Sequence, residues 1–384
     1  MRALFVSNGH GEAAIAERIA QELRALVRVE IDHLALVGDG LSETMTDVGP
    51  QRAMPSGGLI AMGNVANIAR DVRSGLLALS FAQYKYLRGV RGRYDVAAAI
   101  GDAYALMMTL IARAPTVFVG TAKSVNVAPY GPFEERVLRR ARACFVRDEP
   151  TARRLREHGV PVEEPANVIV DLFATSDDPR AQDAVAEFDP AIALFPGSRE
   201  SAYADARFLL NVAGDLARGT RLGAVLSVAR GLSADRFAQA AREDGFDVVR
   251  FDDATIPFAL ARAGRTVARA WRGTLGPILD RVSLVLGQAG TANEAAAAAG
   301  VPVVAFERER DRKGRWYRQR QRGLLGDAMI VLPAGAREAA AGVAGLIGDA
   351  ARREAMGAQG RARMGSPGGA RRVAERLYAV AGAS

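Results

Sequence analysis

Short apolar runs alternate with helical patterns along this chain, and the clearest example lies in its last third. Two apolar runs, at residues 283–286 and 301–306, predict buried strands. Between them, residues 287–290 predict a glycine turn, and the nearly all-alanine stretch Thr291–Ala299 predicts a helix that ends at Gly300. Strand, glycine loop, helix and strand in this order form a βαβ unit. Such a unit can bind a ligand at its glycine loop, or it can be an ordinary buried crossover with no ligand.

The same alternation runs through the whole chain and divides it into two similar halves. Apolar runs predict further strands at residues 2–7, 29–34, 94–101, 116–120, 142–147, 168–172, 191–195, 222–228, 247–251 and 328–332. Helical patterns lie between or after them, at residues 13–26, 150–158, 202–218, 337–356 and 369–380. This order predicts an α/β protein in which helices cover both faces of parallel sheets.

The domain boundaries follow from composition. We expect an N-terminal domain at residues 1–175 and a C-terminal domain at residues 190–365, joined by the polar, proline-containing stretch 175–190. Residues 366–384 are expected to form a C-terminal helix that can pack back on the first domain. The chain has 384 residues, 49% of them apolar and 24% charged, which are globular values. It has no run of 18 apolar residues, no recognisable signal peptide and one cysteine, Cys144, expected in a core strand.

The net charge of +8 comes almost entirely from arginine, whose planar fork binds oxyanions. No helix-turn-helix, aromatic stacking motif or zinc spacing indicates nucleic acid. Residues 59–93 combine apolar and aromatic side chains with cations. The apolar ones are Leu76, Leu77, Leu79, Phe81, Tyr84, Tyr86 and Leu87, and the cations are Arg70, Arg73, Lys85, Arg88, Arg91 and Arg93. This segment is either a surface for an anionic membrane or a core helix with a solvated basic end.

Polar residues follow two predicted strands of the first half, where open α/β sheets hold their sites. Asn8, Gly9, His10, Gly11 and Glu12 follow the first strand, in a loop that is not the GxGxxG dinucleotide motif. Asp102 follows the strand at 94–101. His10 and Asp102 are candidates for a general base. The alternatives are that Asp102 caps the next helix and that His10 is a structural loop histidine.

Two loops of the second half have the chemistry of a diphosphate site. Pro196-Gly197-Ser198-Arg199-Glu200 follows a strand, so its backbone N–H groups and Arg199 can meet an anion. In the second loop, Gly290 permits close backbone approach and Thr291 can cap the helix. Glu294, one turn into that helix, can accept hydrogen bonds from ribose hydroxyls. Asp177-Asp178 and Asp252-Asp253 lie in polar turns, so we expect no metal site.

These motifs resemble a known family. LFPGSRE followed by AGTANEAAAAAGVPVV is similar to the donor half of lipid A disaccharide synthase and its relatives, and more loosely to the UDP-GlcNAc transferase of peptidoglycan synthesis. The resemblance implies a GT-B fold of two Rossmann-like, doubly wound domains facing a cleft, with a UDP-sugar as substrate and neither cofactor nor essential metal. SNGHGE (7–12) takes the place of the first glycine loop, on the acceptor side. IGDAYAL (100–106) gives Asp102 the role of catalytic base, and QRGLLG (321–326) brings Gln321 to the sugar.

The resemblance also implies an activity. We expect an inverting, metal-independent glycosyltransferase that moves GlcNAc or a derivative from a UDP-sugar to a lipid-linked acceptor. We expect the protein to be cytoplasmic and peripherally bound to the inner face of the cytoplasmic membrane. Two other readings stay open: a UDP-sugar 2-epimerase on the same fold, and a nucleotide-sugar-binding protein without turnover.

Overall fold

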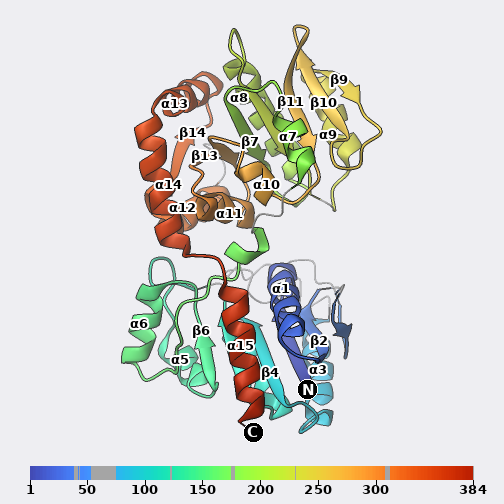
Figure 1. Ribbon diagram of the computed structural model, residues 1–384, viewed down its shortest axis with the longest axis vertical. Coiled ribbons are helices and arrows are strands. Elements are labelled where there is room, and N and C mark those ends of the chain that lie inside the picture. The colour runs from blue at the N-terminus through green and yellow to red at the C-terminus, as the bar shows by residue number, and fades with distance from the viewer. Residues whose placement is uncertain are drawn as a thin grey trace. The chain divides into compact units, whose positions relative to one another are not determined.

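The chain builds two compact units. The computed structural model describes residues 1–38, 42, 44–52, 75–121, 123–173, 178–229, 231–307 and 312–383. Unit 1 combines Met1–Leu172 with Gly365–Ser384, and unit 2 is Phe173–Met364. The last helix of the chain therefore belongs to the unit in which the chain begins (Figure 1).

Unit 1 contains a six-stranded parallel sheet in the order β3-β2-β1-β4-β5-β6. The strands are β1 (Arg2–Asn8), β2 (Glu30–Val37), β3 (Thr46–Asp47), β4 (Val96–Gly101), β5 (Thr116–Gly120) and β6 (Ala143–Phe145). The central strands β1 and β4 are buried along their length apart from Arg2 at the start of β1, as expected for strands covered on both faces.

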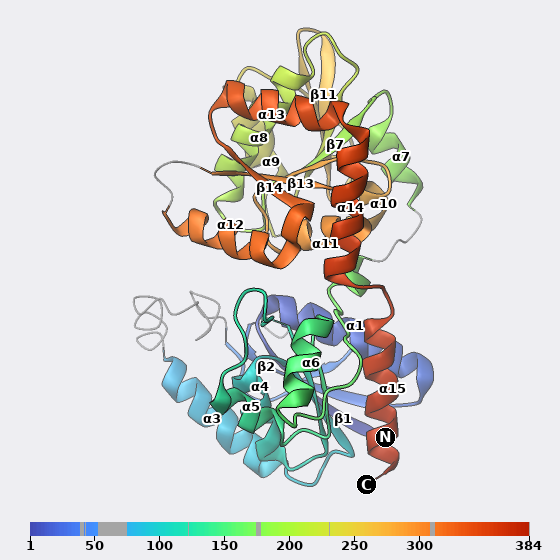
Figure 2. The ribbon, with the colours of Figure 1, turned by 90° about the vertical axis from the view of Figure 1, so that its left-hand side faces the viewer.

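Helices cover both faces of this sheet, as Figure 2 shows edge-on. One face carries α1 (His10–Leu26) and α15 (Gly369–Gly382), which pack against each other. The other carries α3 (Leu76–Gly89), α4 (Ala103–Thr109), α5 (Pro132–Leu138) and α6 (Glu149–Glu157), with the short turn η1 (Leu110–Ala112) after α4. The core on that second face joins β-strand residues such as Val6 and Phe118 to the buried sides of these helices.

The segment before the unit boundary differs from its sequence prediction. Residues 168–172 were expected to form a strand, but Val170–Phe173 is a 3₁₀ turn, η2. The buried carboxylate of Asp171 explains the difference, because it accepts hydrogen bonds from the backbone N–H groups of Gly368 and Ala370. Asp171 therefore caps α15 with hydrogen bonds to residues almost 200 positions away.

Unit 2 contains an eight-stranded sheet in the order β14-β13-β12-β7-β8-β11-β10-β9. Its strands are β7 (Ala191–Phe195), β8 (Gly223–Ser227), β9 (Asp247–Arg250), β10 (Phe258–Arg262), β11 (Arg265–Trp271), β12 (Val285–Gly287), β13 (Val303–Glu307) and β14 (Met329–Pro333). The pairs from β14 to β11 are parallel, whereas β11, β10 and β9 pair antiparallel. The two doubly wound parallel sheets confirm the expected fold class, and the β10–β11 hairpin adds to it.

The helices of unit 2 are α7 (Pro179–Val185), α8 (Ala202–Leu216), α9 (Ala234–Glu243), α10 (Gly276–Leu279), α11 (Thr291–Ala299), α12 (Arg312–Leu325), α13 (Ala336–Gly348) and α14 (Ala350–Met364), with the turn η3 (Gly326–Ala328). The largest core lies between the sheet and α8, α9 and α13. In Figure 2, α8 and α9 lie on one side of this sheet, with α7 and α10 on the other.

Several predicted elements agree with the structure to the residue, namely the strands 116–120 and 191–195 and the helix Thr291–Ala299. Two further predictions were wrong. Part of the expected linker forms α7, because Asp178 caps it and three of its side chains are buried. The single helix expected at 337–356 is broken into α13 and α14 at Asp349, whose carboxylate accepts a hydrogen bond from the Arg352 N–H and starts the second helix.

Candidate functional site

The carboxyl edge of the sheet in unit 1 brings together residues from three strand ends. The strand order reverses between β1 and β4, and such a switch point is where open α/β sheets bind ligands. Asn8 ends β1, and its side-chain Nδ2 donates a 3.1 Å hydrogen bond to Oδ1 of Asp102, which directly follows β4. The structure thus places two of the predicted site residues in direct contact.

Asp102 is the N-cap of α4, as one of the two sequence interpretations proposed. Its Oδ1 accepts a second hydrogen bond, 3.0 Å long, from the backbone N–H of Ala105. Both of these bonds go to the same oxygen, so Oδ2 accepts no hydrogen bond from the part of the chain that the structure describes. Capping the helix therefore fixes the carboxylate in place while leaving one oxygen available to a ligand.

The loop between β1 and α1 carries the other predicted residues of unit 1. Gly9 adopts a φ of 132°, and a Cβ there would lie 2.7 Å from Oε2 of Glu12, so only glycine fits. Oε1 of Glu12 accepts a 3.1 Å hydrogen bond from the Thr121 hydroxyl, just after β5. A Cβ at Gly11 would meet open space. His10 is the first residue of α1, and its side chain lies outside what the structure describes.

Two residues of this edge were not predicted. Thr121 links β5 to Glu12, and its carbonyl accepts a 3.2 Å hydrogen bond from Nη1 of Arg147, a buried arginine two residues after β6. Thr121 follows the predicted strand 116–120 and Arg147 ends the predicted strand 142–147, so the rule that placed Asp102 at a strand end applied to them as well. Sequence reasoning missed them because neither lies in a motif that carries the family resemblance.

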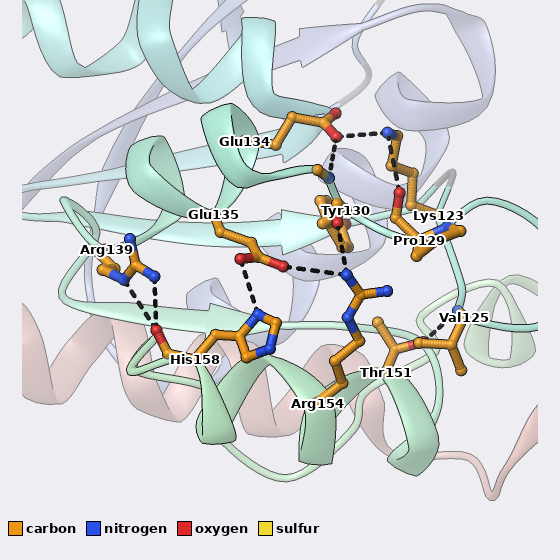
Figure 3. Close-up of polar contacts among 11 residues, drawn as sticks. Lys123, Val125, Pro129, Tyr130, Glu134, Glu135, Arg139, Thr151, Arg154 and His158 are labelled. Carbon is orange, nitrogen blue, oxygen red and sulfur yellow. Dashed lines mark hydrogen bonds and ion pairs between the residues drawn. The ribbon is translucent and has the colours of Figure 1, made fainter.

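A charged network holds the segment that leads from Thr121 to α5 and α6 (Figure 3). Glu135 is buried, and its carboxylate contacts Nδ1 of His158 at 2.9 Å and the guanidinium of Arg154 at 3.6 Å. Beside it, Lys123 pairs with Glu134 at 2.6 Å. These pairs fix the loop between β5 and α5 against α6.

The remaining histidine and the cysteine have structural roles in unit 1. The ring of His33 bridges Ser7 of β1 at 2.9 Å and Asp47 of β3 at 3.0 Å. Burial lowers the pKa of His33, which keeps the ring neutral in this bridge. Cys144 lies in β6 as expected, and burial raises the pKa of its thiol to about 12, so it stays protonated.

In unit 2, the two predicted loops start from neighbouring strands. β7 pairs with β12 so that Phe195 lies opposite Gly287, and the backbone N–H of Gln288 donates a 2.9 Å hydrogen bond to the Phe195 carbonyl. β7 is also the strand at which the order of this sheet reverses. The loop 196–201 and the loop 288–290 therefore emerge from neighbouring strands at a switch point of the sheet.

The residues of these loops are placed as follows. Gly197 adopts a φ of 113°, and the following Ser198 and Arg199 are exposed. Gly290 is the N-cap of α11 and has no side chain that could cap the helix, so the prediction that Thr291 caps it was wrong: Thr291 is the first helical residue. The first N–H groups of a helix without a side-chain cap stay available to an anion. Glu294 lies in the first turn of α11.

Gln321, which was expected to contact the sugar, binds the loop before α11 in the structure. Its side chain is buried, and Nε2 donates hydrogen bonds to the carbonyls of Ala289, at 3.3 Å, and Gly290, at 2.8 Å. Its Oε1 accepts a 3.1 Å hydrogen bond from Nδ2 of the buried Asn293. Because its amide is engaged in this way, Gln321 holds the backbone of the loop before α11 in place.

Asp178 and Asp253, one from each pair of aspartates, bind nearby backbone N–H groups. Asp178 accepts a 3.0 Å hydrogen bond from the Arg180 N–H, and Asp253 accepts one of 2.7 Å from the Thr255 N–H. Asp177 lies outside the described residues. Among the residues that the structure describes, no three His, Cys, Asp or Glu side chains are grouped to hold a metal ion.

Comparison with known proteins relates the chain to others by structure alone. No protein-family model and no curated protein sequence matches it. A protein of Listeria monocytogenes assigned as a UDP-N-acetylglucosamine 2-epimerase matches with a TM-score of 0.60 and 13% identity, over 98% of this chain and 95% of that one. The UDP-GlcNAc 2-epimerase of Neisseria meningitidis, bound to UDP-GlcNAc, has a TM-score of 0.57 and 13% identity, over 100% of both chains.

A third match is MurG of Acinetobacter baumannii, with a TM-score of 0.58 and 15% identity over 98% of this chain and 99% of that one. At these identities the likeness concerns the fold. The two doubly wound parallel-sheet units therefore have a GT-B-like fold. Epimerases and transferases among the matching structures share this fold.

Proposed function

We propose that this protein is an inverting glycosyltransferase that uses a UDP-sugar, with GlcNAc or a derivative as the transferred sugar. The observation that carries the proposal is the pair of neighbouring loops in unit 2, one with Arg199 and the other leading into the N-terminus of α11. Backbone N–H groups and a guanidinium are the partners that a diphosphate requires. Structural neighbours that contain UDP or UDP-GlcNAc support the same ligand class.

In the proposed reaction the acceptor hydroxyl attacks the anomeric carbon from the face opposite the diphosphate. The bond from that carbon to the phosphate oxygen breaks, and UDP leaves with the electron pair. The proton of the acceptor passes to Asp102, whose Oδ2 is held ready by the two hydrogen bonds to Oδ1. Arg199 and the N-terminus of α11 stabilise the charge that develops on UDP.

We expect turnover to be unaffected by EDTA, because Arg199 and backbone N–H groups carry the diphosphate charge in this proposal. The measurement is the rate of UDP release with and without chelator, followed by addition of magnesium or manganese. Loss of activity in EDTA and its recovery with either metal would contradict the expectation. A thermal melt with EDTA, run in parallel, excludes an effect on folding.

The exposed face of α3 supports a lipid-linked acceptor. Leu77 is 65% exposed, Phe81 59% and Tyr84 36%, and their spacing places them along one side of the helix. The ammonium of Lys85 lies 4.7 Å from the centre of the Phe81 ring, and Arg88 follows one turn later. An apolar helix face beside cations suits an anionic bilayer. Residues 59–74 of the expected membrane segment lie outside the described residues.

We expect the protein to sediment with anionic vesicles at low salt and to be released at high salt, because each cation near an anionic surface contributes about 1 kcal/mol and salt screens it. No described helix is long and apolar enough to cross a membrane. The double substitution Leu77→Ser and Phe81→Ser should weaken sedimentation. Phe133→Ser is the matched control, since Phe133 is 66% exposed on α5 of the same unit. Equal binding to neutral vesicles, or an equal loss in the control, would refute the role of α3.

A UDP-sugar 2-epimerase is the second candidate, favoured by the several epimerase structures that match nearly the full length of the chain. An epimerase interconverts UDP-sugars without an acceptor, whereas a transferase releases UDP only when an acceptor is present. Incubation with UDP-GlcNAc, with and without a lipid extract, followed by analysis of UDP and of the sugar nucleotide, distinguishes the two. Binding of UDP-GlcNAc with neither product would indicate a protein without turnover.

A further inference from the structure

The helix α12 reaches the loop before α11 with two side chains one turn apart. Gln321 binds the carbonyls of Ala289 and Gly290, which fixes α12 against this loop. One turn earlier, Tyr317 lies on the same side of α12, because residues i and i+4 share a helix face. The hydroxyl of Tyr317 is packed so closely on Gly290 that a Cβ at residue 290 would lie 2.3 Å from it. Tyr317 was not among the residues predicted from the sequence.

The surroundings of this hydroxyl are charged. Burial and the carboxylate of Glu294 raise the pKa of Tyr317, while the guanidinium groups of Arg199 and Arg320 lower it to a smaller extent. With a pKa above its ordinary value, the phenol stays protonated at neutral pH and acts as a hydrogen-bond donor. It makes no hydrogen bond to any residue in the described parts of the chain, and the side chain is 38% exposed.

A phenol that keeps its proton and contacts the loop at the start of α11 is suited to donate a hydrogen bond to an anion bound at this loop. We propose that Tyr317 binds the diphosphate of the nucleotide substrate, donating its hydroxyl hydrogen to a phosphate oxygen beside Arg199. This inference rests on the proposed use of a UDP-sugar and adds to that site a residue from α12. It also gives a reason for glycine at position 290, where any side chain would displace the hydroxyl.

The first test is titration calorimetry of Tyr317→Phe with UDP and uridine. A hydrogen bond to a charged group predicts that UDP binds about tenfold more weakly, or more, while uridine binding is unchanged. Trp316→Phe is the control, because Trp316 is its exposed neighbour on α12. Unchanged UDP affinity in Tyr317→Phe, or an equal loss for uridine, would overturn the inference. If the wild-type protein does not bind UDP, the proposed function fails and the inference falls with it.

A second test separates the contact with Gly290 from the ligand. Gly290→Ala should weaken UDP binding in the wild-type background, because its Cβ displaces the Tyr317 hydroxyl. In the Tyr317→Phe background the same Cβ would meet the ring carbon Cζ at 3.6 Å, an ordinary contact, so Gly290→Ala should add little further loss. Melting temperatures of the four proteins monitor folding. Equal losses from Gly290→Ala in both backgrounds would show that the hydroxyl does not act on this loop.

Discussion

Asp102→Asn is expected to lower turnover by about 10²–10⁴-fold, the usual contribution of a positioned general base, while UDP binding stays nearly unchanged. The substitution is mild for the fold. Asparagine caps helices as well as aspartate does, and its Oδ1 can keep both hydrogen bonds, from Asn8 and from Ala105. What changes is the second oxygen, which becomes an NH₂ group and can no longer accept a proton. Steady-state rates and UDP calorimetry on the same protein measure the two effects separately.

Two variants serve as comparisons for this result. Asp148→Asn is the matched control, because Asp148 caps α6 in the same unit with a 2.9 Å hydrogen bond from Thr151 N–H. We expect it to keep its activity. His10→Ala tests the other candidate base: if it abolishes turnover while Asp102→Asn remains active, the role of base passes to His10. If both variants remain active, neither residue is the base.

Arg199→Ala is expected to weaken UDP binding by about 1.5–3 kcal/mol, which is roughly a 10- to 150-fold rise in Kd. Arg199 is exposed and follows β7 in the loop beside α11. Its side chain has no hydrogen bond or ion pair with the residues that the structure describes, so its loss should leave the free energy of unfolding within about 0.5 kcal/mol of the wild type. Calorimetry with UDP measures the binding, and urea unfolding measures the stability.

The control for this experiment is Arg221→Ala, which removes the same charge from unit 2. Arg221 is exposed and precedes β8, so it lies at the amino edge of the sheet, away from the loops that follow β7 and β12. We expect this variant to bind UDP as the wild type does. A loss of equal size in both variants would indicate general attraction of UDP to a basic protein and would count against a local site at Arg199.

The βαβ unit of the second half was predictable because its signals are local. Gly300 ends α11 with a φ of 80°, and the buried apolar runs on either side can only be strands. The hairpin of β10 and β11 also depends on a local feature, a two-residue turn in which Ala263 and Gly264 both adopt positive φ. It was missed because alternating alanine and arginine favour helix in isolation, and strand pairing overrides that preference.

The candidate site was predictable only where it follows strand ends. Asp102 and Arg199 were found by that rule, and the structure places each at the carboxyl edge of its sheet. Tyr317 and the role of Gln321 depend on how α12 lies against the Gly290 loop, which is a tertiary contact with no sequence signal. The segment 168–172 was wrongly predicted as a strand for a similar reason, because the hydrogen-bond partners of Asp171 are at the far end of the chain.

The attachment of α15 to unit 1 has a consequence for the order in which the protein matures on the ribosome. Residues 173–364 are contiguous, so unit 2 can fold as soon as it leaves the exit tunnel. Unit 1 emerges first but receives α15 last, and until then the side of α1 that packs on α15 has no cover. Unit 1 therefore has all six strands of its sheet early, but it lacks α15 until the whole of unit 2 has been synthesised and Asp171 can cap that helix.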